Sequence, residues 1–194
     1  SRTSTAIMGG MAGSYRFTEV LAGDYYVQFE VGGGLIATSA NAGGDDTIDS
    51  DVTDANGPFT TDIITLTTSG VENTDLGLLE LGDISGKVWV DVNGNGLRDG
   101  GEPGRNGITV VLYDSGGLEV SRTITDIIGG MAGSYRFTDV LAGDYYVQFE
   151  VGGGLISTSA NAGGDDTIDS DVTDANGPFT TDIINLTTSG LKNG

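Results

Sequence analysis

One acidic segment combines residue types and spacing that could bind a metal ion. Residues 91–102 match the calcium-loop pattern D-x-[DN]-x-[DN]-G-x5-E at every fixed position. In such a loop the early side chains converge on one cation, a central glycine permits the turn, and a final glutamate completes the coordination. A solvated Asn-Gly turn between strands is the alternative, and the full match favours Ca²⁺. The candidate ligands are Asp91, Asn93, Asn95, Leu97 through its carbonyl, Asp99 and Glu102.

A second acidic cluster occurs twice in the chain. Residues 165–174 hold five aspartates, and the same pattern stands at residues 45–54. Carboxylates at this density repel one another, so the loop either extends into solvent or binds cations, and we expect Ca²⁺. Alternation along an extended segment points to Asp165, Asp169 and Asp171 as the foremost ligands. The full candidate set is Asp165, Asp166, Asp169 and Asp171, with Asp45, Asp46, Asp49 and Asp51 in the earlier copy.

The composition excludes several classes of function. The 194 residues include 34 glycines, no cysteine, no histidine, and 28 acidic against 8 basic side chains, for a net charge of -20. This charge disfavours nucleic acid and anionic membranes as partners. Without His or Cys the chain has no soft zinc ligand, no thiol nucleophile and no imidazole base, so we expect no enzyme.

Two further exclusions concern carboxylate chemistry and membranes. Glycoside hydrolysis by paired carboxylates is a remote alternative, because acidic loops on a glycine-rich rim supply no apolar pocket to raise the pKa of an acid. The sequence has no apolar run of about 18 residues, so we expect no membrane insertion within this window.

The elements that must position these loops belong to a tandem repeat. Residues 1–70 match residues 121–190 at an offset of 120 and differ only at positions 4, 6, 8, 19, 37 and 65. A period of this length is the size of a domain. We place the boundary near residues 81–83. Residues 1–81 are then a partial repeat without its first strands, and residues 82–194 are a nearly complete repeat whose last strand we expect to be missing.

Within the second copy, apolar residues alternate at period two between turn signals. The pattern predicts strands at residues 87–90, 108–113, 135–137 and 145–151, with Gly-Gly pairs as turns. No window shows a helical stripe. The predicted fold is all-β, with tandem antiparallel β-sandwich modules of about seven strands each.

Four motifs carry a resemblance to a known family. They are GKVWVDVNGNG at 86–96, GITVVLYD at 107–114, GSYRFTDVLAGDY at 133–145 and the aspartates of 165–171. The chain resembles the Sdr-type B-repeat domains of staphylococcal serine-aspartate-repeat surface adhesins, and more broadly the collagen-adhesin B-type modules. The resemblance implies an Ig-like or prealbumin-like sandwich, Ca²⁺ at both acidic loops, and a place outside the cell, secreted or on the bacterial surface.

The expected function is structural. Calcium-rigidified repeats would form an extracellular stalk, adhesin or fibre that serves cell adhesion and biofilm formation. The expected partners are neighbouring repeats of the same chain, or copies of itself that exchange strands in a filament. The alternative is an adhesive module for a host protein or polysaccharide, whose near-identical copies would bind with avidity.

Overall fold

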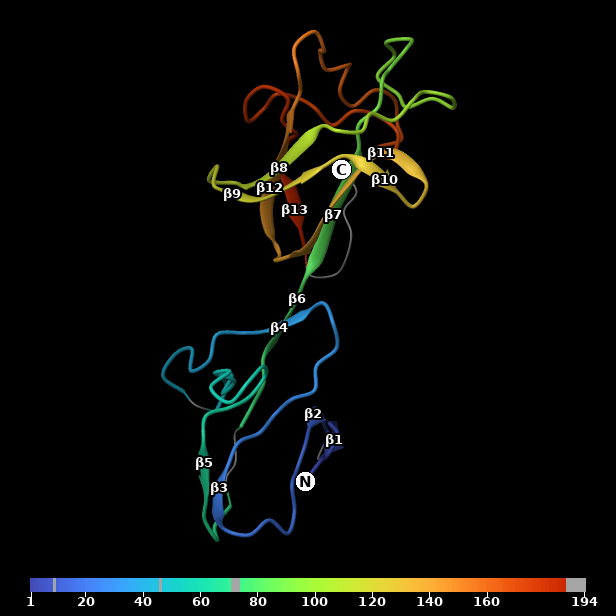
Figure 1. The fold of residues 1–194 in the computed structure, drawn as a ribbon. Coiled ribbons are helices and arrows are strands. Elements are labelled where there is room, and N and C mark those ends of the chain that lie inside the picture. The colour runs from blue at the N-terminus through green and yellow to red at the C-terminus, as the bar shows by residue number, and fades with distance from the viewer. Residues whose placement is uncertain (9, 46, 71–73, 188–194) are drawn as a thin grey trace. The chain divides into compact units, whose positions relative to one another are not determined.

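The structure is a computed structural model that describes residues 1–8, 10–45, 47–70 and 74–187. These residues form strands and loops without a helix, which confirms the all-β prediction (Figure 1). No helix that could cross a membrane is found among them. The chain divides into two compact units. The first comprises Ser1–Gly32 and Ala37–Leu78, and the second comprises Gly33–Ile36 and Leu79–Gly194.

The second unit contains a two-sheet antiparallel sandwich. One sheet has the order β10-β11-β7 and the other the order β13-β12-β8-β9, which together supply the predicted seven strands. The strands are β7 (Gly82–Lys87), β8 (Thr109–Asp114), β9 (Glu119–Ile124), β10 (Asp126–Ile128), β11 (Met131–Val140), β12 (Gly143–Glu150) and β13 (Ile184–Leu186).

The hydrophobic core lies between these two sheets. Alternate residues of β12, Tyr145, Val147 and Phe149, are buried, as the period-two pattern predicts. They face side chains of the other sheet, and the Tyr135 and Phe149 rings meet edge to face with centroids 5.7 Å apart. Each buried side chain of this size contributes about 1.5–3 kcal/mol of hydrophobic stabilisation. Leu112 of β8 is fully buried in the same cluster.

The first strand lies earlier than the sequence predicts. Strand β7 ends at Lys87, whereas the alternation indicated a strand over residues 87–90. The Val88 N–H still donates to the Gly133 carbonyl of β11 at 2.8 Å, but after Val88 the backbone changes partner, because the Val90 N–H donates to the Pro103 carbonyl at 3.0 Å. Within β7, Gly86 allows close approach to β11, since a Cβ there would lie 2.6 Å from the Tyr135 hydroxyl. Alternation alone does not reveal this change of partner.

The first unit repeats part of this pattern with shorter strands. Its strand β3 pairs with β5 in the register Asp24↔Thr65, and β12 pairs with β13 in the matching register Asp144↔Asn185. Val52 is the one buried apolar side chain among the described residues of this unit. The strands are β1 (Ala6–Met8), β2 (Met11–Ser14), β3 (Gly23–Tyr25), β4 (Leu35–Ala37), β5 (Ile64–Leu66) and β6 (Leu78–Glu80).

Candidate metal centre

The loop at residues 91–102 is closed around its first carboxylate. Asp91 accepts hydrogen bonds from the backbone N–H groups of Gly94 at 2.7 Å and Gly96 at 2.8 Å. The Thr158 hydroxyl donates to Asp91 Oδ2 at 2.5 Å. The hydrogen bond from Thr158, followed by that from Gly96, lowers the pKa of Asp91. The carboxylate is therefore ionised at neutral pH, as a calcium ligand must be.

The remaining predicted side chains of the loop gather at Asp99 and Glu102. Asp99 Oδ2 accepts from the side-chain amides of Asn93 at 2.8 Å and Asn95 at 2.9 Å. The two Glu102 oxygens accept backbone N–H groups from within the loop. A cation at Asp99 would need the amide oxygens turned toward it in place of the amide nitrogens. The ligand types therefore fit Ca²⁺ after rotation of two amide groups.

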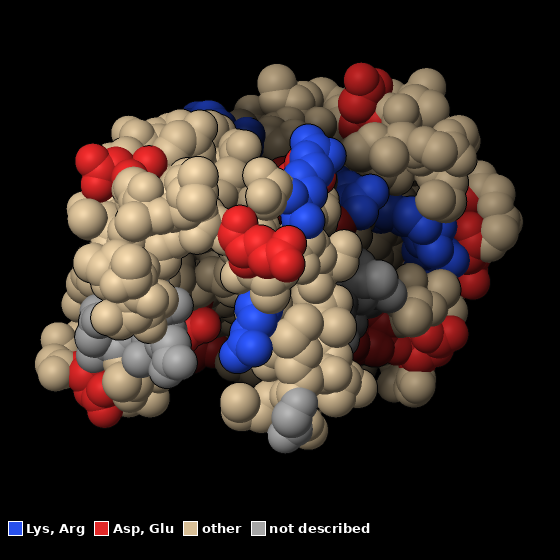
Figure 2. All heavy atoms as spheres, turned by 90° about the horizontal axis from the view of Figure 1, so that it is seen from below, with Lys and Arg blue, Asp and Glu red and all other residues tan. Residues whose placement is uncertain are grey.

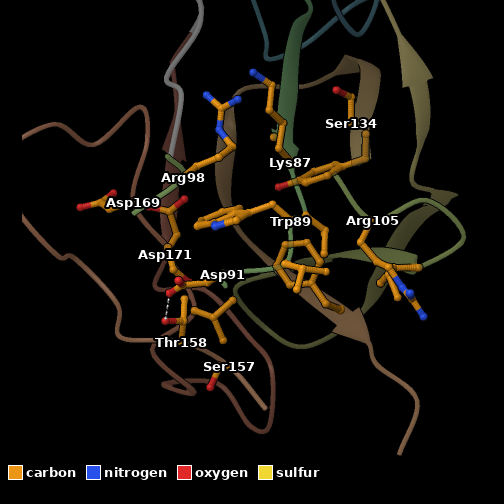
Figure 3. A pocket seen from close by; sticks show the side chains of 18 of the residues that line it. Lys87, Trp89, Asp91, Arg98, Arg105, Ser134, Ser157, Thr158, Asp169 and Asp171 are labelled. Carbon is orange, nitrogen blue, oxygen red and sulfur yellow. Dashed lines mark hydrogen bonds between the residues drawn. The ribbon is translucent and has the colours of Figure 1, made fainter. Parts of the chain in front are cut away.

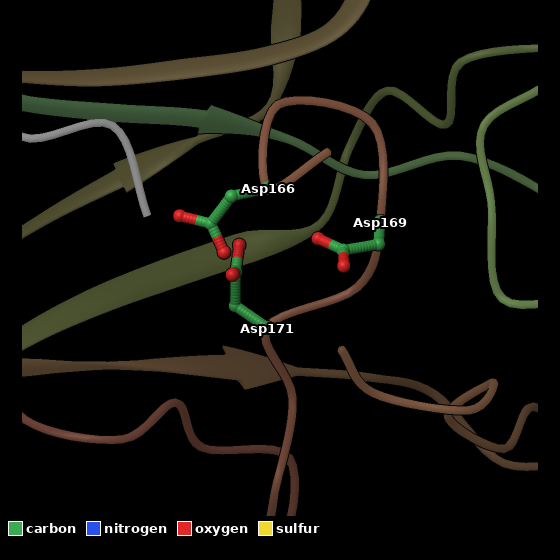
Figure 4. Close-up of side chains that lie close together, drawn as sticks. All are labelled: Asp166, Asp169 and Asp171. Atoms are coloured by element: carbon green, nitrogen blue, oxygen red, sulfur yellow. The ribbon is translucent and has the colours of Figure 1, made fainter. Parts of the chain in front are cut away.

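Three aspartates of the second cluster come together without a cationic partner. Ligand oxygens of Asp166, Asp169 and Asp171 lie within 4.8 Å of one another (Figure 4). No salt bridge within the described residues joins them to a Lys or Arg. Asp169 is buried, and its Oδ1 has no hydrogen-bond partner in the described part of the chain. An unpaired buried carboxylate oxygen costs free energy that a bound cation would offset, so this cluster fits a hard divalent ion.

The electrostatics of the cluster are visible in Asp171. Burial, and then the charges of Asp166, Asp169 and Asp182, raise the pKa of Asp171 to about 6. The shift measures how strongly the site disfavours a further negative charge when no cation is present. In one view of the whole surface, acidic side chains are scattered over the visible face and several lie beside basic ones (Figure 2).

The structure brings the two acidic segments side by side. Leu97 of the loop pairs with Asp169 of the cluster through an isolated antiparallel bridge. The Arg98 N–H donates to the Ile168 carbonyl at 2.6 Å. Gly96 permits this approach, because it has φ +82° and a Cβ there would lie 2.6 Å from the Ser159 carbonyl oxygen. Residues about 70 positions apart in the sequence therefore form one acidic region.

Asp165 takes a different place from the one that alternation indicates. Its Oδ1 accepts from the Thr167 N–H at 3.0 Å and the Thr167 hydroxyl at 2.6 Å, which lowers the pKa of Asp165. The Ile168 N–H donates back to the Asp165 carbonyl, so residues 165–168 form a turn. Alternation does not hold in a turn, and Asp166 joins Asp169 and Asp171 instead.

The first copy reproduces this arrangement in part. Asp45 accepts from Thr47 as Asp165 does from Thr167, and Asp49 Oδ1 is buried without a partner among the described residues. Asp51 Oδ2 accepts from the Asp75 N–H at 2.6 Å. Asp46 lies outside the described residues.

A hollow of about 870 Å³ adjoins the cluster in the second unit. Trp89, Thr158 and Asp171 line it, as Figure 3 shows. Burial lowers the pKa of Lys87 at its rim, followed by the nearby charge of Arg98. The expectation that the acidic loops supply no pocket able to raise the pKa of an acid is wrong, because Asp171 lines this hollow and burial raises its pKa. The contact of Thr158 with Asp91 was not predicted from sequence either. No motif links positions 67 residues apart, and only the shared fold brings them together.

Comparison with known proteins identifies relatives across the chain. The model of the SdrD B-like domain family matches residues 1–78 and 80–193. Serine-aspartate repeat-containing protein F of Staphylococcus epidermidis is 37% identical over 177 residues, which cover 89% of this chain and 10% of that protein. Serine-aspartate repeat-containing protein D of Staphylococcus aureus strain Newman is 36% identical over 176 residues, which cover 89% of this chain and 12% of that protein. The chain thus spans about a tenth of the length of these relatives.

Proposed function

Because the chain belongs to the SdrD B-like domain family, we propose that it is a structural repeat whose sandwich is rigidified by bound Ca²⁺. The family resemblance inferred from the motifs is confirmed, and the relatives are serine-aspartate repeat proteins. The chain is an extracellular adhesin repeat of the cell surface. Its family is structural or adhesive and not enzymatic.

One observation supports the calcium proposal above all others. The three carboxylates of Asp166, Asp169 and Asp171 lie within 4.8 Å of one another beside the matched loop. The aspartate cluster would hold one ion. The matched loop would hold another through Asp91, Asn93, Asn95, Leu97, Asp99 and Glu102. Bound ions would join segments that are distant in sequence, much as disulfides do in a chain with cysteines. An ion bound only to the folded state stabilises it by RT ln(1 + [L]/Kd).

The test is thermal unfolding of the chain in Ca²⁺ and in EGTA. Extracellular calcium modules bind at about 0.1–1 mM. At ten times Kd each site adds about 1.4 kcal/mol, so several degrees of Tm should be lost in EGTA. Asp169→Asn should reduce the calcium-dependent shift and leave the metal-free Tm unchanged or higher, because it relieves repulsion among the three carboxylates.

Asp139→Asn is the matched control. Asp139 is exposed on β11 and has φ +58°, a conformation that Asn tolerates. This variant removes one negative charge but should keep the full calcium shift. If EGTA leaves the melting curve unchanged, or if Asp139→Asn loses as much of the shift as Asp169→Asn, the calcium proposal fails.

We also propose that the repeat boundary lies at residues 81–83, with one repeat at 1–81 and the next at 82–194. The two ranges matched by the family model, 1–78 and 80–193, support this division. The partners we propose are neighbouring repeats of the same array.

A further inference from the structure

The two repeats differ in the surroundings of one segment whose sequence is almost identical in both. In the second repeat this segment borders the hollow described above, which we call the groove. Residues 34–38 read GLIAT and residues 154–158 read GLIST. The first of these contains β4, which pairs with β6, whereas residues 155–157 form no strand. Leu35 and Ile36 are half-buried, but Leu155 is 44% exposed and Ile156 is 92% exposed. The difference therefore arises from what lies against the segment and not from the segment itself.

In the first repeat, residues 74–81, with the sequence TDLGLLEL, lie against this segment, and we call them the linker strand. The Leu81 N–H donates to the Gly34 carbonyl at 2.9 Å, and the Thr38 N–H donates to the Gly77 carbonyl at 2.9 Å. From Gly34 to Thr38 the paired residues run backwards, from Leu81 to Gly77, so the two segments pair in antiparallel orientation. The approach is close, because a Cβ at Gly77 would lie 2.3 Å from the Thr38 hydroxyl.

Further contacts hold the beginning of the linker strand. The Asp75 N–H donates to Asp51 Oδ2 at 2.6 Å, and the Asp51 N–H donates to the Asp75 carbonyl at 2.9 Å. The Tyr15 hydroxyl donates to the Thr74 carbonyl. The linker strand is thus bound through backbone groups along most of its length.

The second repeat presents the same receptor groups around its hollow. In the first repeat the linker strand is contacted by Tyr15, Gly34, Thr38 and Asp51. Their counterparts at an offset of 120 all line the hollow of about 870 Å³, and they are Tyr135, Gly154, Thr158 and Asp171. In the described part of the chain, the backbone N–H groups of Thr158 and Asp171 donate to no backbone acceptor. The Nε1 atom of Trp89, which also lines the hollow, is buried without a partner among the described residues.

We propose that this groove is the docking site for a linker strand with the sequence of residues 74–81, supplied in cis by an array in which that sequence follows the repeat. Of the positions offset by 120 from the linker strand, only Gly194 lies within the sequence. Docking would pair the orphan backbone groups, cover Leu155 and Ile156, and complete the edge of the repeat by strand addition.

The test uses a synthetic peptide of residues 74–81 and the 194-residue chain in EGTA. Trp89 is the single tryptophan and lines the groove, so its emission should shift as the peptide binds. Fluorescence anisotropy of a labelled peptide should give a saturable curve with the same Kd. A peptide with Gly77→Val should bind at least about tenfold more weakly, because its side chain would overlap the Thr158 hydroxyl.

Two chain variants locate the site. Ile156→Asp should weaken binding by about tenfold or more, and because this side chain is 92% exposed the fold should be retained, as circular dichroism would show. Ile7→Asp, at a residue that is 75% exposed in the first repeat and does not line the groove, should bind as the parent chain does. Absence of saturable binding to the folded parent chain, or equal binding by both variants, overturns the proposal.

A chain extended after Gly194 by the sequence of residues 75–81 tests the source of the strand. It should remain a monomer in light scattering, bind no added peptide and show the shifted Trp89 emission by itself. Peptide binding equal to that of the parent chain would show an unfilled groove, and dimer formation would show strand exchange between copies. Either of these two results contradicts docking in cis.

Discussion

At the scale of the residue, burial converts Asp171 into a pH-sensitive group. Its pKa of about 6 lies above the ordinary value of 3.8 because the site desolvates the carboxylate and surrounds it with like charges. The folded state therefore binds more protons than the unfolded state between these two pH values. The resulting stabilisation is complete below about pH 4 and is lost as the pH rises through about 6.

We therefore predict that the metal-free chain loses Tm as the pH rises from 4 to 7. Because Asp171 is partly exposed, solvent screening limits the change attributable to it to about 4 °C. The calcium-dependent gain in Tm should move in the opposite direction and shrink below about pH 6, because protons compete for the ligand. Scans in EGTA and in Ca²⁺ across this range measure both trends. Asp171→Asn should flatten the metal-free profile, and an unchanged profile would contradict this assignment.

At the scale of the element, two loops are held together by one glycine. Gly94 and Gly96 belong to the same loop and both have positive φ, at +72° and +82°. A Cβ on Gly94 meets no atom within 4 Å, whereas a Cβ on Gly96 would lie 2.6 Å from the Ser159 carbonyl and 2.7 Å from the Ala162 Cβ. The first glycine serves the turn alone, and the second also serves the contact between the loop and the segment that leads to the aspartate cluster.

Alanine substitutions should separate these two roles. Gly94→Ala carries only the cost of a left-handed conformation, about 1–2 kcal/mol. Gly96→Ala adds a collision with backbone, which cannot move aside cheaply, and should cost a further ~1–3 kcal/mol. Chemical denaturation of both variants in EGTA measures the difference in unfolding free energy. Equal losses for the two variants would mean that the loops do not pack as the structure shows.

At the scale of the whole molecule, charge repulsion acts on every part of the chain. The net charge is -20, and much of it lies in the matched loop and in the two aspartate clusters. Such self-repulsion destabilises a compact state, and salt screens it over a Debye length that falls from about 10 Å at 0.1 M to about 4 Å at 0.5 M. Screening acts on all charges, whereas ion binding acts on specific ligands.

A comparison of NaCl, Ca²⁺ and Mg²⁺ should distinguish general charge screening from binding of Ca²⁺ at specific ligands. In EGTA, raising NaCl to about 0.5 M should increase Tm by screening. Ca²⁺ at about 5 mM barely changes ionic strength, yet it should raise Tm further than the same concentration of Mg²⁺, which prefers a rigid octahedral site. Equal shifts with Ca²⁺ and Mg²⁺ would indicate screening instead of a calcium centre.

The sequence by itself determined the fold class, the repeat and the family. Alternation at period two places Tyr145, Val147 and Phe149 on one buried face, because side chains of a strand alternate whatever their surroundings. The calcium-loop spacing is equally local, since Asp91 to Glu102 lie within twelve consecutive residues.

The tertiary structure alone decided which distant groups meet. It placed Thr158 on Asp91, joined Leu97 to Asp169 and replaced Asp165 by Asp166 in the cluster of three carboxylates. It also gave nearly identical segments, residues 34–38 and 154–158, different burial. These contacts depend on strand pairing between residues far apart in the chain, and local sequence patterns carry no record of such partners.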